Sequence, residues 1–67
     1  MGMLDVDLAY YTRQIEDWSR EELFKETTRL VTARDGWKKV INQFGTGHLM
    51  VMTADAMLEI VLEKLGG

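Results

Sequence analysis

The chain has 67 residues, with eleven acidic and eight basic side chains, a formal net charge of −3, one histidine and no cysteine or proline. A chain this short allows one small domain, and domains below about 70–80 residues usually need a disulfide, a metal or an oligomeric partner for stability. The missing cysteines exclude disulfides and thiolate metal sites, and His48 alone cannot supply the ligands of a zinc site, so oligomerisation is the stabilising device that remains.

The first predicted helix covers about residues 5–17. Asp5 is the expected N-cap, and Asp7 in the first turn would complement the helix dipole. Apolar residues follow at alternating spacings of four and three, which predicts one buried stripe, made of Leu4, Leu8, Tyr11, Ile15 and Trp18.

The segment "SREE" at residues 19–22 predicts where the second helix begins. Ser19 can accept a hydrogen bond from the amide three residues on, while the Glu22 side chain reaches back to the Ser19 amide. Trp18 and Leu23 flank this capping box as a hydrophobic staple. The second helix should therefore start at Arg20, directly after a tight corner.

The second helix is expected to run over residues 20–44. Its apolar stripe keeps one register throughout, widened by Phe24 and Val31; Arg34 lies on the stripe and is expected to turn its guanidinium outward. Asp35-Gly36 is a turn signal, so a bend or break at Gly36 is the alternative. The stripe itself consists of Leu23, Thr27, Leu30, Arg34, Trp37, Ile41 and Phe44.

The "GTG" segment at residues 45–47 predicts the turn of a helical hairpin, with Gly45 in the left-handed conformation after the helix. The third helix should cover about residues 48–65. Thr53 is an alternative N-cap, in which case residues 48–52 would be extended. Asp55, Glu59 and Glu63 recur every four residues and are expected to form an acidic line facing water.

The third helix carries more apolar surface than a chain of this size can cover. Eleven of the fourteen residues from Leu49 to Leu62 are apolar, and two preceding helices offer only one stripe each. We therefore expect a single all-α domain over residues 1–67, a helical hairpin or three-helix protomer that forms a dimeric helix bundle. The predicted contact residues are Met50, Met57, Leu58, Val61, Leu62, Leu65, Trp37 and Tyr10.

The residue types argue against an enzyme, a metal centre or a bound cofactor. A nucleophilic triad or a di-metal carboxylate site would need a histidine with partners at defined spacings, and His48 is expected to be an exposed polar residue. Two groups of carboxylates are expected to lie on solvated helix faces, namely Glu21, Glu22 and Glu26 on the second helix and Asp55, Glu59 and Glu63 on the third.

Two further classes of partner, nucleic acids and membranes, can be assessed from the distribution of basic residues and from the length of the apolar run. Nucleic-acid binding would require the basic residues of the second helix to share one exposed face. Membrane insertion is not expected, because the run from Leu49 to Leu62 is short and contains two acidic residues. Without a secretory signal, the chain is expected to be cytoplasmic. The basic residues in question are Arg29, Arg34, Lys38 and Lys39.

The order "YYTRQIEDWSREEL…RDGWKKVINQ" resembles the small phycobilisome-degradation adaptors, a resemblance that implies a dimeric helical hairpin. It covers about half of the chain, requires a gap of about one helical turn, and leaves the apolar third helix without a counterpart. We carry over no functional residue from it.

The sequence as a whole predicts a small non-enzymatic module for protein–protein interaction, an adaptor, inhibitor or regulator that acts as a homodimer. The apolar, methionine-rich third helix could instead accept a segment of a different protein. A weak nucleic-acid-binding regulator and a purely structural oligomerisation segment are the alternatives.

Overall fold

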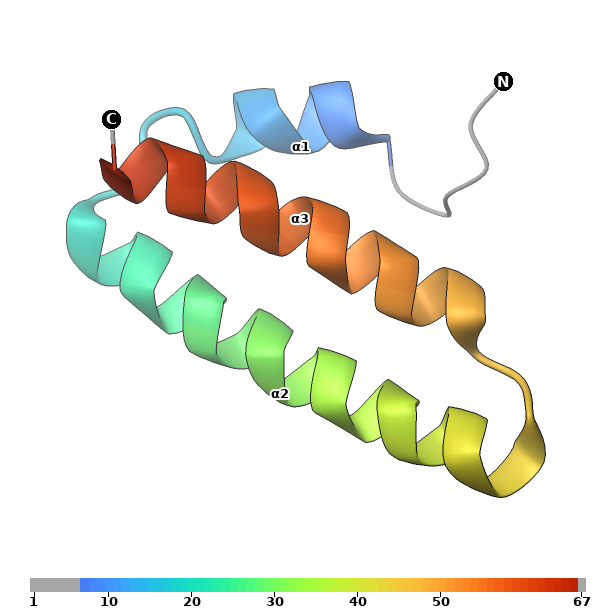
Figure 1. The fold of residues 1–67 in the computed structure, drawn as a ribbon. Coiled ribbons are helices and arrows are strands. Elements are labelled where there is room, and N and C mark those ends of the chain that lie inside the picture. Colours follow the sequence, from blue (N-terminus) through green and yellow to red (C-terminus); the bar gives the residue numbers. More distant parts are fainter. Residues whose placement is uncertain (1–6, 67) are drawn as a thin grey trace.

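The computed structural model describes residues 7–66, which form three helices: α1 (Leu8–Gln14), α2 (Arg20–Phe44) and α3 (His48–Gly66). α2 and α3 form an antiparallel hairpin, and α1 lies beside α3 near the end of the hairpin away from its turn (Figure 1). The described residues contain no strand, so the all-α prediction is confirmed for this part of the chain.

α1 is shorter than predicted at both ends. Its N-cap is Asp7, whose carboxylate accepts hydrogen bonds from the amides of Ala9 (3.0 Å) and Tyr10 (3.2 Å). The placement of Asp7 inside the first turn was therefore wrong; Asp5 and Leu4 lie outside the described residues. The helix ends at Gln14, and a short turn after it leads the chain into α2.

The capping box at the start of α2 is confirmed. Ser19 Oγ accepts the amide of Glu22 (3.2 Å), and Glu22 Oε1 accepts the amide of Ser19 (2.9 Å). From Arg20 the helix continues without a break to Phe44, so the turn signal at Gly36 does not interrupt it. The free energy gained by continuing the helix on both sides of Gly36 outweighs the free-energy cost of one glycine inside it.

The hairpin turn depends on two glycines with positive φ. Gly45 ends α2 in the left-handed conformation (φ 71°), and its amide donates to the carbonyl of Ile41 (2.8 Å). Gly47 has φ 111°, and a Cβ there would lie 3.1 Å from the Trp37 ring. Gly47 thus lets the turn pass closely over Trp37, which fixes where α3 begins.

α3 begins at His48, without an extended segment before Thr53. The Thr53 hydroxyl donates to the carbonyl of Leu49 (2.8 Å), inside the helix, so Thr53 is not an N-cap. The predicted acidic line is confirmed, since Asp55, Glu59 and Glu63 are all exposed.

The core lies where all three helices meet. Ile15, in the corner after α1, and Val61 of α3 are both fully buried. Burying such a side chain contributes roughly 1.5–3 kcal/mol, so this cluster supplies most of the packing energy of a small fold. Around it pack Trp18, Val31, Met57, Ile60 and Leu65, and its buried members are Tyr11, Ile15, Leu23, Leu30, Leu58 and Val61.

Two polar contacts join the helices of the hairpin on one side. An Arg20 nitrogen donates to the carbonyl of Leu65 (3.2 Å), and Arg34 Nη1 donates to Asp55 (3.1 Å). The guanidinium of Arg34 therefore turns towards α3 rather than freely outward, and its Nε is buried without an acceptor among the described residues.

Two aromatic residues expected along the buried stripe of α2 are exposed. Phe44, the last residue of α2, is 71% exposed, and Phe24 is 54% exposed and does not pack against the core. The stripe predicted from spacing is thus mostly buried in its first half, and its side chains become more exposed towards the turn.

Gly36 offers a direct test of the continuous helix. A Cβ at Gly36 would meet nothing within 4 Å, and its φ is not positive. We expect Gly36→Ala to raise the free energy of unfolding by about 1 kcal/mol, measured by chemical denaturation, because alanine loses less backbone entropy in a helix. As the matched control, Gly45→Ala should destabilise, since its φ is 71°. Destabilisation by Gly36→Ala would show that α2 bends at this position.

Candidate functional site

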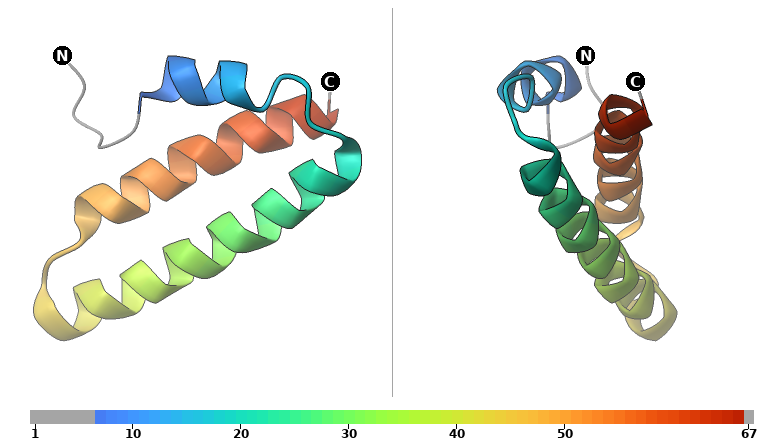
Figure 2. Two further views of the ribbon diagram at one scale, coloured as in Figure 1. Left: turned by 180° about the vertical axis from the view of Figure 1, so that it is seen from behind. Right: turned by 90° about the vertical axis from the view of Figure 1, so that its left-hand side faces the viewer.

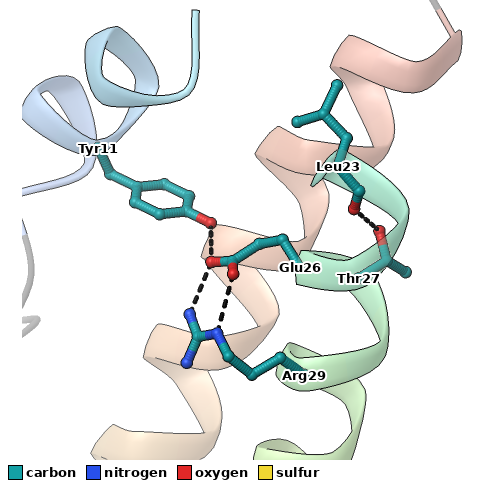
Figure 3. Close-up of polar contacts among 5 residues, drawn as sticks. All are labelled: Tyr11, Leu23, Glu26, Thr27 and Arg29. Atoms are coloured by element: carbon teal, nitrogen blue, oxygen red, sulfur yellow. Dashed lines mark hydrogen bonds and ion pairs between the residues drawn. The ribbon is translucent and has the colours of Figure 1, made fainter. Parts of the chain in front are cut away.

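A buried carboxylate attaches α1 to the hairpin (Figure 3). The Tyr11 hydroxyl donates to Glu26 Oε2 (2.5 Å). Arg29, one turn further along α2, donates to both oxygens of the same carboxylate, at 2.8 Å from Nε and 2.6 Å from Nη2. Glu26 thus has a phenol on one side and a bidentate guanidinium on the other, which is the arrangement that makes burial of a charge tolerable.

These contacts change the acidity of all three groups. The hydrogen bond from Arg29 holds the pKa of the Glu26 carboxyl below its ordinary value, against the opposing effect of burial. Burial, together with the hydrogen bond to Glu26, raises the pKa of the Tyr11 phenol well above its ordinary range. The hydrogen bond to Glu26 raises the pKa of Arg29. At neutral pH the site therefore holds a carboxylate, a neutral phenol and a guanidinium.

The expectation that Glu26 lies on a solvated face was wrong. Its side chain is buried, unlike Glu21 and Glu22, because α1 brings Tyr11 over it. Two signals in the sequence pointed that way: Tyr11 lies on the predicted stripe, and Glu26 is followed by Arg29 at the i+3 spacing that allows an ion pair.

A groove of about 150 Å³ lies between α2 and α3, beyond the contact with α1. It starts at Arg29 and continues towards the hairpin turn, past Trp37 on α2 and Met50 on α3. Arg29 is the one charged side chain along it, and its guanidinium is engaged by Glu26. The groove is thus apolar in character, and the residues lining it are Arg29, Leu30, Ala33, Trp37, Met50, Thr53, Ala54 and Met57.

The structure gathers only some of the predicted contact residues at this groove. Trp37, Met50 and Met57 line it together and are partly buried. Leu58 and Val61 belong instead to the core of the single chain, so a partner docking on this fold would not reach them. The pattern of apolar residues predicted a wide apolar face on α3 but did not identify which part of that face α2 covers.

The other three predicted contact residues lie elsewhere. Leu65 is half-buried and packs against the core. Leu62 and Tyr10 are exposed, on α3 and α1 respectively, and neither lines the groove. The predicted set therefore divides among a core, a groove and two separate surface positions.

The basic residues of α2 do not form one surface. Arg29 is bound by Glu26 and Arg34 by Asp55. Lys38 and Lys39 are exposed, and adjacent helical residues point about 100° apart. This arrangement lacks the continuous basic face that nucleic-acid binding would require.

Within residues 7–66, no three acidic, histidine or cysteine side chains are placed to share a metal ion. His48 is exposed at the start of α3. Each helix of this part of the chain is too short or too polar to span a bilayer.

No protein-family model, curated protein sequence or solved structure significantly matches this chain. The resemblance of two of its segments to the phycobilisome-degradation adaptors therefore adds no functional assignment.

Adjacent tyrosines provide a matched test of the buried carboxylate. Tyr11 is 6% exposed and bonded to Glu26, whereas Tyr10 is 58% exposed. We expect Tyr11→Phe to lower the free energy of unfolding by about 1.5 kcal/mol, since it removes one hydrogen bond to a charged group without changing the packed ring. Tyr10→Phe should leave the stability unchanged in the same denaturation experiment. Equal effects of the two substitutions would mean that the Tyr11 hydroxyl does not anchor α1.

The depressed pKa of Glu26 predicts a loss of stability in acid. Because the folded-state pKa lies below the unfolded value of about 4.3, the stabilisation is complete above that pH and disappears as the pH falls through the folded-state pKa. Denaturation of the wild type and of Glu26→Gln across this range should show the wild-type advantage shrinking with falling pH. A difference that stays constant would contradict the pairing with Arg29.

Proposed function

We propose that this chain is a small non-enzymatic protein–protein interaction module, an adaptor or regulator, that works as a homodimer and accepts an apolar segment of another protein in the groove between α2 and α3. The observation that carries the proposal is the groove itself, which Trp37 of α2 and Met50 and Met57 of α3 line together.

The chemistry of the groove favours a helical apolar segment as its occupant. Its lining includes two small side chains, Ala33 and Ala54, beside which another backbone can approach closely. It also includes methionines, which adapt to differently shaped partners, and a tryptophan, a residue type that often dominates interface energy. α1 already lies against the hairpin next to the groove, so a second helix seated there would extend the same layer (Figure 2).

The exposed apolar residues support a module that is completed by other chains. Large hydrophobic side chains lie at the surface of all three helices. A small fold that leaves such residues uncovered gains stability when a second polypeptide buries them. These exposed residues are Tyr10, Phe24, Phe44, Leu49, Met52 and Leu62.

Photo-crosslinking from the groove tests the proposal. With a benzophenone amino acid in place of Trp37, irradiation in cells should link the chain to one dominant protein other than itself. The same amino acid in place of Glu21, which is 81% exposed on α2, should not. Cross-links to other copies of the chain alone would refute a groove for a foreign segment.

Two methionines on α3 provide the matched variants. Met57 lines the groove, whereas Met52 is exposed and does not line it. Met57→Asp should abolish the cross-link from position 37, because a charge placed in an apolar contact costs several kcal/mol, about 3–5 when it is fully buried and unpaired. Met52→Asp should preserve it. Circular dichroism establishes that both variants are folded, and equal loss in both would rule out the groove as the binding surface.

A further inference from the structure

The end of the hairpin at its turn differs in charge from the rest of the chain, and we call residues 36–54 the tip. All eleven acidic side chains lie outside the tip, whose only ionisable side chains are Lys38, Lys39 and His48. With a neutral histidine the tip carries a charge of +2 and the rest of the chain −5, which together give the net charge of −3. Because the charge is divided in this way, an anionic surface attracts the tip and repels the other end of the molecule.

The tip also exposes large apolar side chains on both helices. Phe44 is the last residue of α2, Leu49 and Met52 are the second and fifth residues of α3, and all three are exposed. The turn that joins these two helix ends forms a free end of the hairpin, whereas α1 packs near the opposite end (Figure 1). A free end of this kind does not enclose a segment of another protein, but its apolar side chains can enter a lipid layer, whose molecules move aside.

The two lysines of the tip lie at the depth that such an insertion requires. Lys38 and Lys39 precede Phe44 by six and five residues, so they lie about 8–9 Å behind it along α2. Helices that bind the surface of a bilayer bury their apolar side chains about 5–10 Å into the boundary between headgroups and acyl chains. With Phe44 at that depth, both ammonium groups reach the level of the lipid phosphates.

The tip lysines are available to bind an anion. Both are exposed, and neither forms an ion pair within residues 7–66. Asp35, the nearest acid along α2, lies one turn before Lys39 and is 3.9 Å from Arg34, which also binds Asp55 (3.1 Å). Ion pairs among the described residues therefore leave the positive charge of the tip uncompensated, and lipid phosphates would supply the missing anions.

We infer that the tip binds the surface of an anionic phospholipid bilayer, with Phe44, Leu49 and Met52 inserted among the headgroups and Lys38 and Lys39 on lipid phosphates. This contact is peripheral and needs no spanning helix, and each helix within residues 7–66 is too short or too polar to span a bilayer. The inference goes beyond the proposed function and does not rest on it, because the inserted side chains do not line the groove.

A fluorophore at the apex of the tip tests the inference without background, because the chain has no cysteine of its own. Thr46→Cys, exposed in the turn, and Glu21→Cys, exposed at the other end of α2, are labelled with nitrobenzoxadiazole. Vesicles of phosphatidylcholine with about 30% phosphatidylserine should blue-shift and brighten the label at position 46, but not at position 21. Vesicles of phosphatidylcholine alone should have much less effect. No change at position 46, or equal changes at both positions, would overturn the inference.

The four lysines of the chain provide two variants with the same net charge. Lys38→Gln with Lys39→Gln should weaken binding to the phosphatidylserine vesicles by roughly tenfold or more, measured by flotation, because two contacts with phosphates are lost. Lys25→Gln with Lys64→Gln removes the two lysines outside the tip and should leave binding unchanged. Equal binding by the two double variants would overturn the role of the tip charge.

The exposed phenylalanines of α2 form a second matched pair. Phe44→Asp should weaken binding by roughly tenfold or more, since it replaces an inserted ring with an anion, whereas Phe24→Asp, near the start of α2, should bind like the wild type. Circular dichroism establishes that both variants are folded. Equal weakening by the two substitutions would show that the tip is not the inserted part.

Two further outcomes separate an acidic protein from a lipid surface and this inference from the proposed function. If vesicles fail to bind and a photo-crosslinker at Thr46 captures an acidic protein, the lipid surface is overturned in favour of that protein. A chain whose tip binds vesicles but whose Trp37 crosslinker captures no foreign protein supports this inference and overturns the groove. The reverse result overturns the tip and leaves the proposed function standing.

Discussion

The fold depends on one buried charge, the Glu26 carboxylate held between Tyr11 and Arg29. α1 has only seven residues, and a helix that short is not stable alone in water. It is held in place because the Tyr11 hydroxyl donates a hydrogen bond to Glu26 of α2 and because Ile15, directly after the helix, packs in the core. This attachment leaves α1 over one end of the hairpin, and the groove begins directly beyond it, at Arg29.

A layer of two helices has two broad faces, and residues 7–66 cover only part of one of them. On the α1 side the uncovered part is apolar, with its one guanidinium already neutralised by Glu26. An apolar surface of this kind suits contact with an apolar segment of another polypeptide.

Local signals predicted both ends of α2 and the start of α3, but not the ends of α1, and tertiary contacts decided which side chains are buried. The Ser19–Glu22 capping box and the left-handed Gly45 are determined by a few neighbouring residues, so the sequence sufficed. Glu26 was misplaced because spacing identifies the face of a helix but not which residue from another helix covers it. For the same reason Leu58 and Val61 could not be separated from Met50 and Met57, since all four share the wide apolar face of α3.

The contact between Arg20 and the Leu65 carbonyl brings the first turn of α2 against the last turn of α3. Trp37 and Met50 lie towards the opposite end of the hairpin, because α3 begins at His48 and Gly47 of the turn lies against the Trp37 ring. A fluorophore, affinity tag or fused domain joined after α3 would thus be held beside the Ser19 corner, at the opposite end of the hairpin from Trp37 and Met50.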